Sequence, residues 1–104
     1  MEVDKYVEWT ESVSVYPAFT DYPYFGLVEE AGEVAGAKAK YLRGDFNEIE
    51  LDRRLKKELG DVLFMAARIC HDKGWKMSEI LDLNVEKLTE RNKNNTIKGD
   101  GDDR

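Results

Sequence analysis

The chain has 104 residues and a mass of 12.0 kDa, a length that accommodates one domain. Twenty-two acidic residues oppose sixteen lysines and arginines, and the resulting net charge of −6 argues against binding to the phosphate backbone of DNA or RNA. No apolar run approaches the ~20 residues of a membrane-spanning helix, and the N-terminal residues lack the pattern of a secretory signal. The single cysteine, Cys70, excludes an internal disulfide or a cysteine-based zinc site. We therefore expect a small folded protein of the cytoplasm.

Apolar residues recur at the three- and four-residue spacing of α-helices, and strand-like alternation is nearly absent. The first predicted helix spans about residues 4–14, with Asp4 as its N-terminal cap. A turn-rich segment follows over residues 16–23 and holds the only two prolines of the chain. The inner face of the first helix is expected to hold Tyr6, Trp9, Thr10 and Val13.

The second predicted helix spans about residues 24–42 and is terminated at Gly44, and the third spans about residues 48–73 and is terminated at Gly74. Ser78 is the predicted cap of a fourth helix that ends near residue 92. The residues expected to face inward are Leu27, Val28, Ala31, Val34, Ala35 and Leu42 in the second helix, Leu51, Leu55, Val62, Met65 and Ile69 in the third, and Leu81, Val85 and Leu88 in the fourth. This pattern predicts an all-α four-helix bundle with a polar tail over residues 93–104.

Two short acidic motifs lie in the second and third predicted helices. The first, residues 29–33, contains Glu29, Glu30 and Glu33, and the second, residues 58–61, contains Glu58 and Asp61. Side chains three residues apart leave the same face of a helix, so two such pairs on facing helices would gather oxygen ligands suited to Mg²⁺ or Mn²⁺. The alternative for a single pair is a solvated helix face, because a chain so rich in acids produces this spacing by chance.

Of these acids, Glu58 is the one that fits a solvent-exposed helix face least well. It occupies a position in the apolar stripe of the third helix, between Leu55 and Val62. A lone carboxylate buried there would cost several kcal/mol unless it were paired or bound to metal. Gly32 and Gly60 lie inside the acidic motifs, where a mid-helix glycine costs about 1 kcal/mol relative to alanine. A close approach of two helices would explain both glycines.

A polar strip on the fourth predicted helix carries the opposite charge. Asn84, Lys87 and Arg91 follow one another at steps of three and four residues and therefore line one edge of the helix. The two cations could clamp phosphate oxygens, or they could form a solvated strip that complements the helix dipole. Carboxylates that hold a metal, together with cations that hold phosphate, are typical of enzymes that act on nucleotides.

The two acidic motifs read Glu-Glu-x-x-Glu and Glu-x-x-Asp, with 24 residues between them. With their apolar flanks, the polar strip of the fourth helix and the Gly- and Asp-rich end of the chain, they resemble the MazG-like all-α nucleoside triphosphate pyrophosphohydrolases from about residue 6 onward. The resemblance implies Mg²⁺-dependent hydrolysis of an NTP or dNTP between the α and β phosphates, which yields NMP and pyrophosphate. It also implies a homodimer or homotetramer in which a neighbouring subunit completes the site.

The same resemblance implies roles for individual residues. The metal ligands would be Glu30, Glu33, Glu58 and Asp61, and the substrate-binding residues would be Asn84, Lys87 and Arg91. A glutamate of the first motif, Glu29 or Glu30, would act as the base for in-line attack on the α phosphorus. Lys57 lies where some relatives carry a further acid, so an additional metal at that position is not expected.

Two other protein classes stay open at this point. A carboxylate-bridged di-iron or di-manganese bundle usually pairs Glu-x-x-His motifs, whereas the one histidine, His71, is better explained as a surface or capping residue. A non-enzymatic helical interaction module would use the acids only to solvate a helix face. In an enzyme, Trp9, Tyr16 or Tyr24 would stack on the nucleobase; otherwise these aromatic residues would pack in the core or in an interface.

Overall fold

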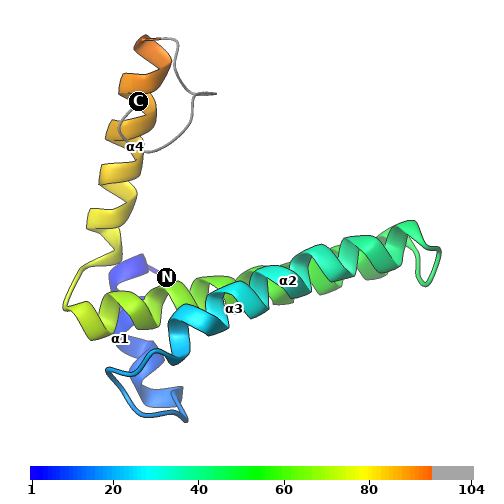
Figure 1. Cartoon of the computed structure of the whole chain (residues 1–104), viewed down its shortest axis with the longest axis horizontal. Helices are drawn as coiled ribbons and strands as arrows, with labels where there is room; N and C mark the ends of the chain where they lie inside the picture. Colours follow the sequence, from blue (N-terminus) through cyan, green and yellow to red (C-terminus); the bar gives the residue numbers. More distant parts are fainter. Residues whose placement is uncertain (95–104) are drawn as a thin grey trace.

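The computed structural model describes residues 1–94, which form four helices and no strand (Figure 1). They are α1 (Val3–Val13), α2 (Tyr22–Leu42), α3 (Glu48–Lys73) and α4 (Met77–Lys93). The all-α prediction is confirmed, and each predicted boundary lies within two residues of the observed one. Within residues 1–94, no helix has the length and apolar character needed to cross a bilayer. The predicted polar tail lies, from residue 95 on, outside the described residues.

α2 and α3 form a long antiparallel hairpin at the centre of the fold (Figure 1). Its loop contains Gly44 at a φ of +92°, a left-handed conformation that costs glycine little. Asn47 begins α3 because its side-chain oxygen accepts a hydrogen bond from the Glu50 N–H at 2.9 Å. Gly74, at a φ of +71°, terminates α3 as predicted. Local signals thus set both ends of α3.

The face of α2 that meets α3 differs from the predicted one. The predicted inner residues Leu27 and Val34 are half-buried, but four others are exposed: Val28, Ala31, Ala35 and Leu42. The residues of α2 that are buried are Pro23, Gly26 and Ala37. A Cβ atom at Gly26 would lie 2.6 Å from the sulfur of Met65, so the two helices approach each other closely at this glycine. Small residues therefore line the side of α2 that packs against α3, and we call this contact between the two helices the α2–α3 seam.

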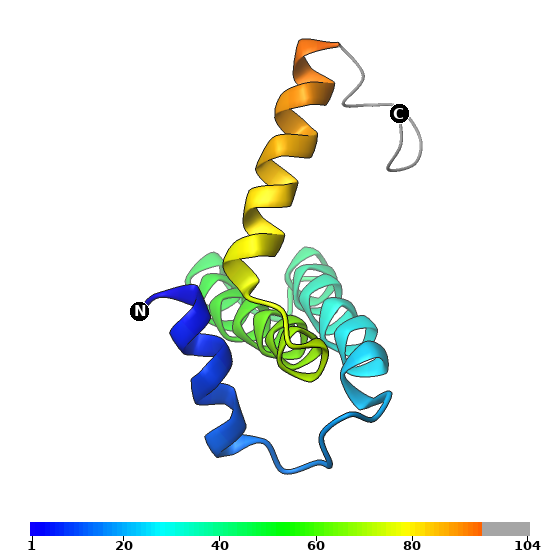
Figure 2. The same cartoon turned by 90° about the vertical axis from the view of Figure 1, so that its left-hand side faces the viewer.

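α1 packs beside the C-terminal half of α3 and forms the small apolar core there (Figure 2). The buried core residues are Val7, Ala67, Cys70 and Met77. Thr10 is buried as predicted, whereas Trp9 is 47% exposed and Val13 is 44% exposed. The physical reason is that α1 has one main neighbour, α3, so only a narrow stripe of this short helix is covered.

α4 projects away from the hairpin instead of lying along it (Figures 1 and 2). The predicted inner residues Leu81, Val85 and Leu88 are 49%, 64% and 39% exposed, so this prediction is wrong for the described protomer. The radius of gyration is 16.4 Å, whereas a compact chain of this length has about 13 Å. The four helices consequently do not close into a bundle within one chain.

Asp4 ties the start of α4 to α1. Its carboxylate accepts hydrogen bonds from the backbone N–H of Ser78 at 2.9 Å and from the Ser78 hydroxyl at 2.6 Å. Two predicted caps are thereby corrected: the residue at the N-cap position is Glu2 in α1 and Lys76 in α4. The two residues predicted to cap separate helices instead bind each other, because the chain brings both helix starts to one corner.

Candidate metal centre

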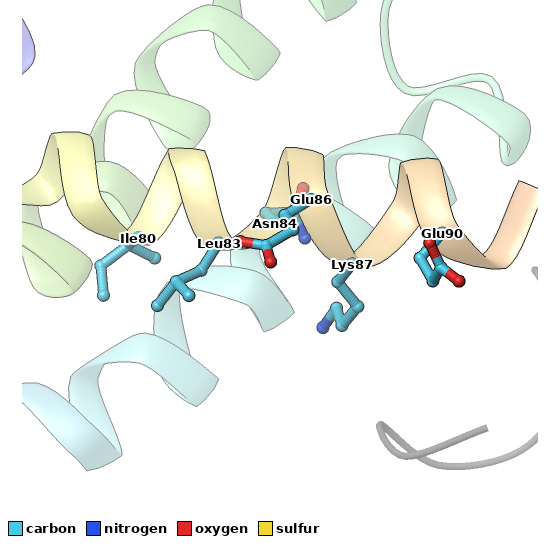
Figure 3. A pocket seen from close by; sticks show the side chains of 6 residues that line it. All are labelled: Ile80, Leu83, Asn84, Glu86, Lys87 and Glu90. Carbon is cyan, nitrogen blue, oxygen red and sulfur yellow. The ribbon is translucent and has the colours of Figure 1, made fainter.

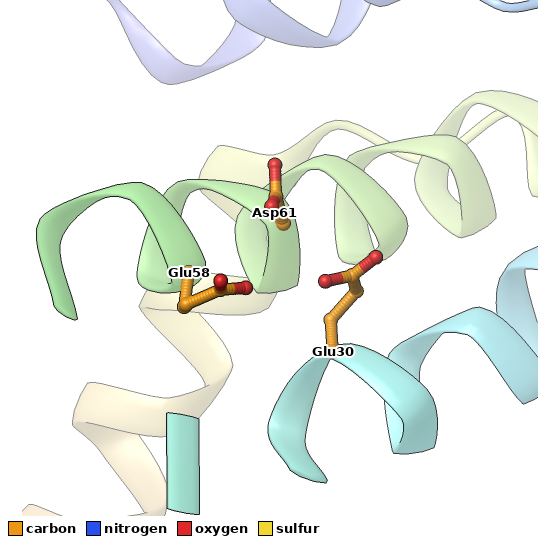
Figure 4. Close-up of side chains that lie close together, drawn as sticks. All are labelled: Glu30, Glu58 and Asp61. Carbon is orange, nitrogen blue, oxygen red and sulfur yellow. The ribbon is translucent and has the colours of Figure 1, made fainter. Parts of the chain in front are cut away.

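Three carboxylates from the two acidic motifs meet in the seam between α2 and α3 (Figure 4). Glu30 of α2 and Glu58 and Asp61 of α3 each offer one oxygen, and these three oxygens lie within 4.8 Å of one another. Glu30 and Glu58 are half-buried and Asp61 is exposed. The group is therefore partly covered by the two helices and open to solvent at Asp61.

Both glutamates occupy seam positions that would ordinarily be apolar. Glu58 lies between half-buried Leu55 and Val62, as the sequence predicts. Glu30 follows buried Gly26 by four residues and precedes half-buried Val34 by four. Sequence reasoning missed the seam position of Glu30 because it assigned the wrong face of α2; the steps between Gly26, Glu30 and Val34 were the signal that could have found it.

The electrostatics of the group favour a bound cation. The pKa of Glu30 is raised, first because burial disfavours its charged form and then because Asp61, Glu58, Glu29 and Glu33 lie close by. Several carboxylates thus lie close together at a place where burial already disfavours the charged form of Glu30. A divalent cation would reverse both effects, because it attracts each carboxylate in its charged form.

The ligand atoms of this group are carboxylate oxygens alone. His71, at the end of α3, is engaged elsewhere: its Nε2 lies 3.0 Å from Glu11 and its Nδ1 lies 2.9 Å from Asp72. Cys70 is buried in the core below α1. An all-oxygen set suits Mg²⁺ or Mn²⁺ better than the nitrogen- and sulfur-preferring metals. Because the group in the described chain contains no histidine, it also disfavours a di-iron or di-manganese centre with Glu-x-x-His motifs.

Glu29 and Glu33 lie beside the group of three and are not part of it. Both side chains are exposed, yet both are close enough to Glu30 to raise its pKa. Because successive helical residues diverge by about 100°, Glu33, three residues on, leaves the helix closer to the direction of Glu30 than Glu29 does. Glu33 consequently flanks the seam on its solvent side.

The polar strip of α4 does not line the carboxylate group within the described part of the protomer, because α4 packs mainly on α1. Asn84 and Lys87 line a broad, open depression of about 520 Å³ on α4 (Figure 3). Arg91, one helical turn further, is buried. The structure thus brings together three of the four predicted ligands and leaves the three predicted substrate-binding residues on α4, away from them.

The glycines inside the acidic motifs have open space around them. A Cβ atom at Gly32 or Gly60 would meet no atom within 4 Å. The expectation that a close helix approach explains these two glycines is therefore wrong for the described chain, in which that role belongs to Gly26.

The aromatic residues considered for base stacking lie in three places. Trp9 stacks on Tyr6, with ring centroids 5.8 Å apart. Tyr16 stacks on Tyr22 at 4.2 Å, and Tyr24 is 43% exposed at the start of α2. The pKa of Tyr6 is raised, first by burial of the phenol and then by the charge of Asp61, so the pair on α1 lies close to one member of the acidic group.

Comparison with known proteins identifies the family. Residues 24–96 match the MazG nucleotide pyrophosphohydrolase domain, and this span includes both acidic motifs and the polar strip of α4. The chain is also 33% identical to the "Gene 37 protein" of Mycobacterium phage L5 over 114 aligned residues, which cover the whole of both chains. No solved structure matches the chain. With its matching domain and its paired acidic motifs, the chain belongs to the MazG nucleotide pyrophosphohydrolase family.

Proposed function

We propose that the protein hydrolyses a nucleoside triphosphate, as NTP or dNTP, to the nucleoside monophosphate and pyrophosphate in a reaction that needs a divalent metal. The observation that carries the proposal is the group of three carboxylate oxygens within 4.8 Å of one another in the α2–α3 seam. Half-buried carboxylates at apolar positions cost stability unless a cation neutralises them. A catalytic metal supplies the reason for keeping them there.

Mg²⁺ is the ion that fits these donors best, and Mn²⁺ shares the same preference for oxygen. Glu30, Glu58 and Asp61 would hold the ion, and Glu33 would add an oxygen from the next turn of α2. A bound ion would polarise the phosphate oxygens and lower the pKa of a coordinated water.

Glu29 and Glu30 are the candidates for the general base. Glu30 is positioned by the seam, next to the place where the ion and its coordinated water would lie. Glu29 is exposed beside it and reaches solvent directly. The base takes a proton from the water whose oxygen forms a bond to the α phosphorus. The bond between that phosphorus and the bridging oxygen breaks, and its electron pair leaves with pyrophosphate.

We also propose that a second copy of the chain completes the site, in a homodimer or homotetramer. The exposed apolar residues of α4, among them Leu81 and Val85, support this proposal, as does the elongated protomer. The cations of α4 stand apart from the carboxylates of their own chain. An α4 from a neighbouring subunit would bring Lys87 and Arg91 to the β and γ phosphates, and Asn84 to the sugar or a phosphate. We place the reaction in the cytoplasm, whose reducing conditions suit a lone, buried cysteine.

Pyrophosphate release from a panel of canonical NTPs and dNTPs tests the proposal. We expect turnover with Mg²⁺ and none after chelation by EDTA. The Glu58→Gln variant should lose at least about 100-fold in kcat/KM, since loss even of a residue that only supports a metal ligand costs 10–100-fold. Glu8→Gln, which removes an exposed acid of α1, is the matched control and should keep full activity. Absence of pyrophosphate from every nucleotide at high protein concentration would contradict the proposal.

A further inference from the structure

The carboxylate of Asp4 connects the N-terminal ends of two helices. Asp4 lies in the first turn of α1, and it accepts hydrogen bonds from the backbone N–H and the hydroxyl of Ser78, the second residue of α4 (Figure 2). The N–H groups of a first helical turn have no partner within their own helix, and negative charge is favoured there. Asp4 therefore stabilises the start of α4 in the way of an N-terminal cap, but from another helix.

The same corner of the fold sets the direction of α4. Met77, the first residue of α4, is buried in the small apolar core, and α1 is the main neighbour of α4 among the described helices. Further along α4, Leu81 and Val85 are exposed and the helix leaves the core (Figure 1). Met77 holds the helix at one point, and the hydrogen bonds between Ser78 and Asp4 hold it at a second. Two such points together fix the direction in which α4 projects.

A small change of this direction would move the far part of α4 by a large distance. Lys87 lies nine residues beyond Ser78 and Arg91 lies thirteen residues beyond it, which at the rise of an α-helix is about 14 Å and about 20 Å. A tilt of about 10° at Ser78 would therefore displace Arg91 by about 3 Å, which is the length of a hydrogen bond. The two cations can meet the phosphates of one bound nucleotide only if α4 starts in a defined direction.

The contact between Asp4 and Ser78 is not needed to hold α1 on α3. Both residues are half-buried, whereas α1 is anchored by buried Val7 and by Thr10, whose hydroxyl accepts a hydrogen bond from the buried Arg68. Hydrogen bonds from Ser78 lower the pKa of Asp4, so the carboxylate is ionised near neutral pH and accepts both bonds. A variant that lacks this carboxylate should keep α1 in place and lose the alignment of α4.

We propose that Asp4 is a positioning residue for the reaction: its two hydrogen bonds to Ser78 fix the direction of α4, and with it the places of Lys87 and Arg91 relative to the carboxylates with which they act. The inference rests on the proposed function, because it takes these two cations to bind the phosphates of a nucleotide. It applies equally when the carboxylates belong to a neighbouring subunit, since the cations reach them through α4 in either case. Asp4 lies outside residues 24–96, which match the family, so the match assigns it no role.

The direction of α4 can be measured without catalysis. Nitroxide labels on Lys38→Cys of α2 and Thr89→Cys of α4, two exposed positions, report the distance between these helices by pulsed electron paramagnetic resonance. Cys70 is buried and stays in place. Dilution with unlabelled protein keeps each measured pair within one chain.

The distance distribution should depend on the contact between α1 and α4. We expect a narrow distribution with Asp4 present and a broadened or shifted one in Asp4→Ala. Ser78→Ala should show a smaller change, because the hydrogen bond from its backbone N–H remains. Glu8→Ala removes an exposed acid of α1; it is the matched control and should leave the distribution unchanged.

Equilibrium binding relates this direction to the substrate. The probe is a dNTP analogue with a methylene group between the α and β phosphorus atoms, measured by calorimetry with Mg²⁺. Asp4→Ala should bind the analogue at least about tenfold more weakly, since one hydrogen bond to a charged group is worth that much. Adding Ser78→Ala should cause no further loss, because both changes act on one contact. The Mg²⁺-dependent rise in Tm should persist in both variants, and in turnover the loss should appear in KM more than in kcat.

Three results would overturn the inference. An unchanged distance distribution in both Asp4→Ala and Ser78→Ala would mean that α4 keeps its direction without the contact. Equal weakening of binding by Glu8→Ala would make the effect one of net charge. Loss of the Mg²⁺-dependent rise in Tm would place the damage at the carboxylate group or in the whole fold. If Asp4→Ala changes distance and binding as expected while the wild type releases no pyrophosphate from any nucleotide, the proposed function fails and the positioning role stands.

Discussion

Replacing Glu58 with glutamine removes one negative charge from the α2–α3 seam and keeps the shape of the side chain. In the wild type the Glu58 oxygen lies within 4.8 Å of oxygens from Glu30 and Asp61. Two unit charges at this distance repel each other by about 0.9 kcal/mol in bulk water and about 3.5 kcal/mol at an effective dielectric constant of 20. Because Glu30 and Glu58 are half-buried and Asp61 is exposed, we expect the metal-free variant to gain about 1–3 kcal/mol, between these two limits.

Thermal unfolding in EDTA measures this gain. For a domain of this size, 1 kcal/mol corresponds to a shift in Tm of about 4–8 °C, so Glu58→Gln should melt at least about 4 °C above the wild type. Millimolar Mg²⁺ should raise the Tm of the wild type, because a ligand that binds only the folded state stabilises it. The variant should lose that increase. Protein concentration must be fixed, since subunit association also shifts Tm.

Glu8→Gln is again the matched control, and it should change neither the Tm in EDTA nor the response to Mg²⁺. The reasoning is refuted if Glu58→Gln melts at or below the wild-type temperature in EDTA and still responds to Mg²⁺. That result would mean that the seam carboxylates are stabilising in their own right and bind no ion.

Three further predictions concern the scaffold. The pKa of Asp4 is lowered from its usual value of 3.8, chiefly by hydrogen bonds from Ser78. The stability that the ionised Asp4 contributes is therefore complete above pH 3.8 and is lost as the pH falls through the lowered pKa. In an acid titration followed by unfolding, the Asp4→Asn variant should lack this acid-dependent loss of stability. Thr10→Val should cost about 1–3 kcal/mol in urea unfolding, because Nη1 of the buried Arg68 donates to the threonine hydroxyl at 3.2 Å. Val85→Glu should convert the proposed oligomer to monomer by light scattering and abolish turnover, whereas a wild type that is already monomeric at micromolar concentration would contradict the subunit contact.

Helix limits could be predicted closely because the signals that set them are local. Gly74 terminates α3 through its own backbone conformation, and Asn47 begins that helix through a hydrogen bond to a residue three positions away. The caps of α1 and α4 were predicted wrongly for the opposite reason. Asp4 binds Ser78, 74 residues further along the chain, and such a contact depends on how the two helices are arranged in space.

Helix faces were harder to assign, and the error on α2 shows why. Hydrophobicity selected Val28 and Leu42, yet both are 73% exposed, because close approach to α3 is permitted by small residues such as Gly26. The apolar residues of α4 are exposed in the same way. A sequence marks a side chain for burial without saying whether its own chain or another chain covers it.

In the candidate site too, features set by a local pattern could be predicted, and features set by the arrangement of the helices could not. Glu58 could be singled out because α3 has a regular apolar stripe that it interrupts. Glu30 could be placed opposite it only once the true seam of α2 was known. The relation of Lys87 and Arg91 to the carboxylates depends on the direction in which α4 leaves the core, and no local pattern fixes that direction.

The position of bond cleavage tests the central claim most directly. Wild-type protein is incubated with Mg²⁺ and a dNTP in ¹⁸O-labelled water, and the products are separated and weighed by mass spectrometry. We predict one labelled oxygen in the nucleoside monophosphate and none in pyrophosphate, since water attacks the α phosphorus. Label in pyrophosphate, release of orthophosphate with a nucleoside diphosphate, or no Mg²⁺-dependent product at all would contradict the claim.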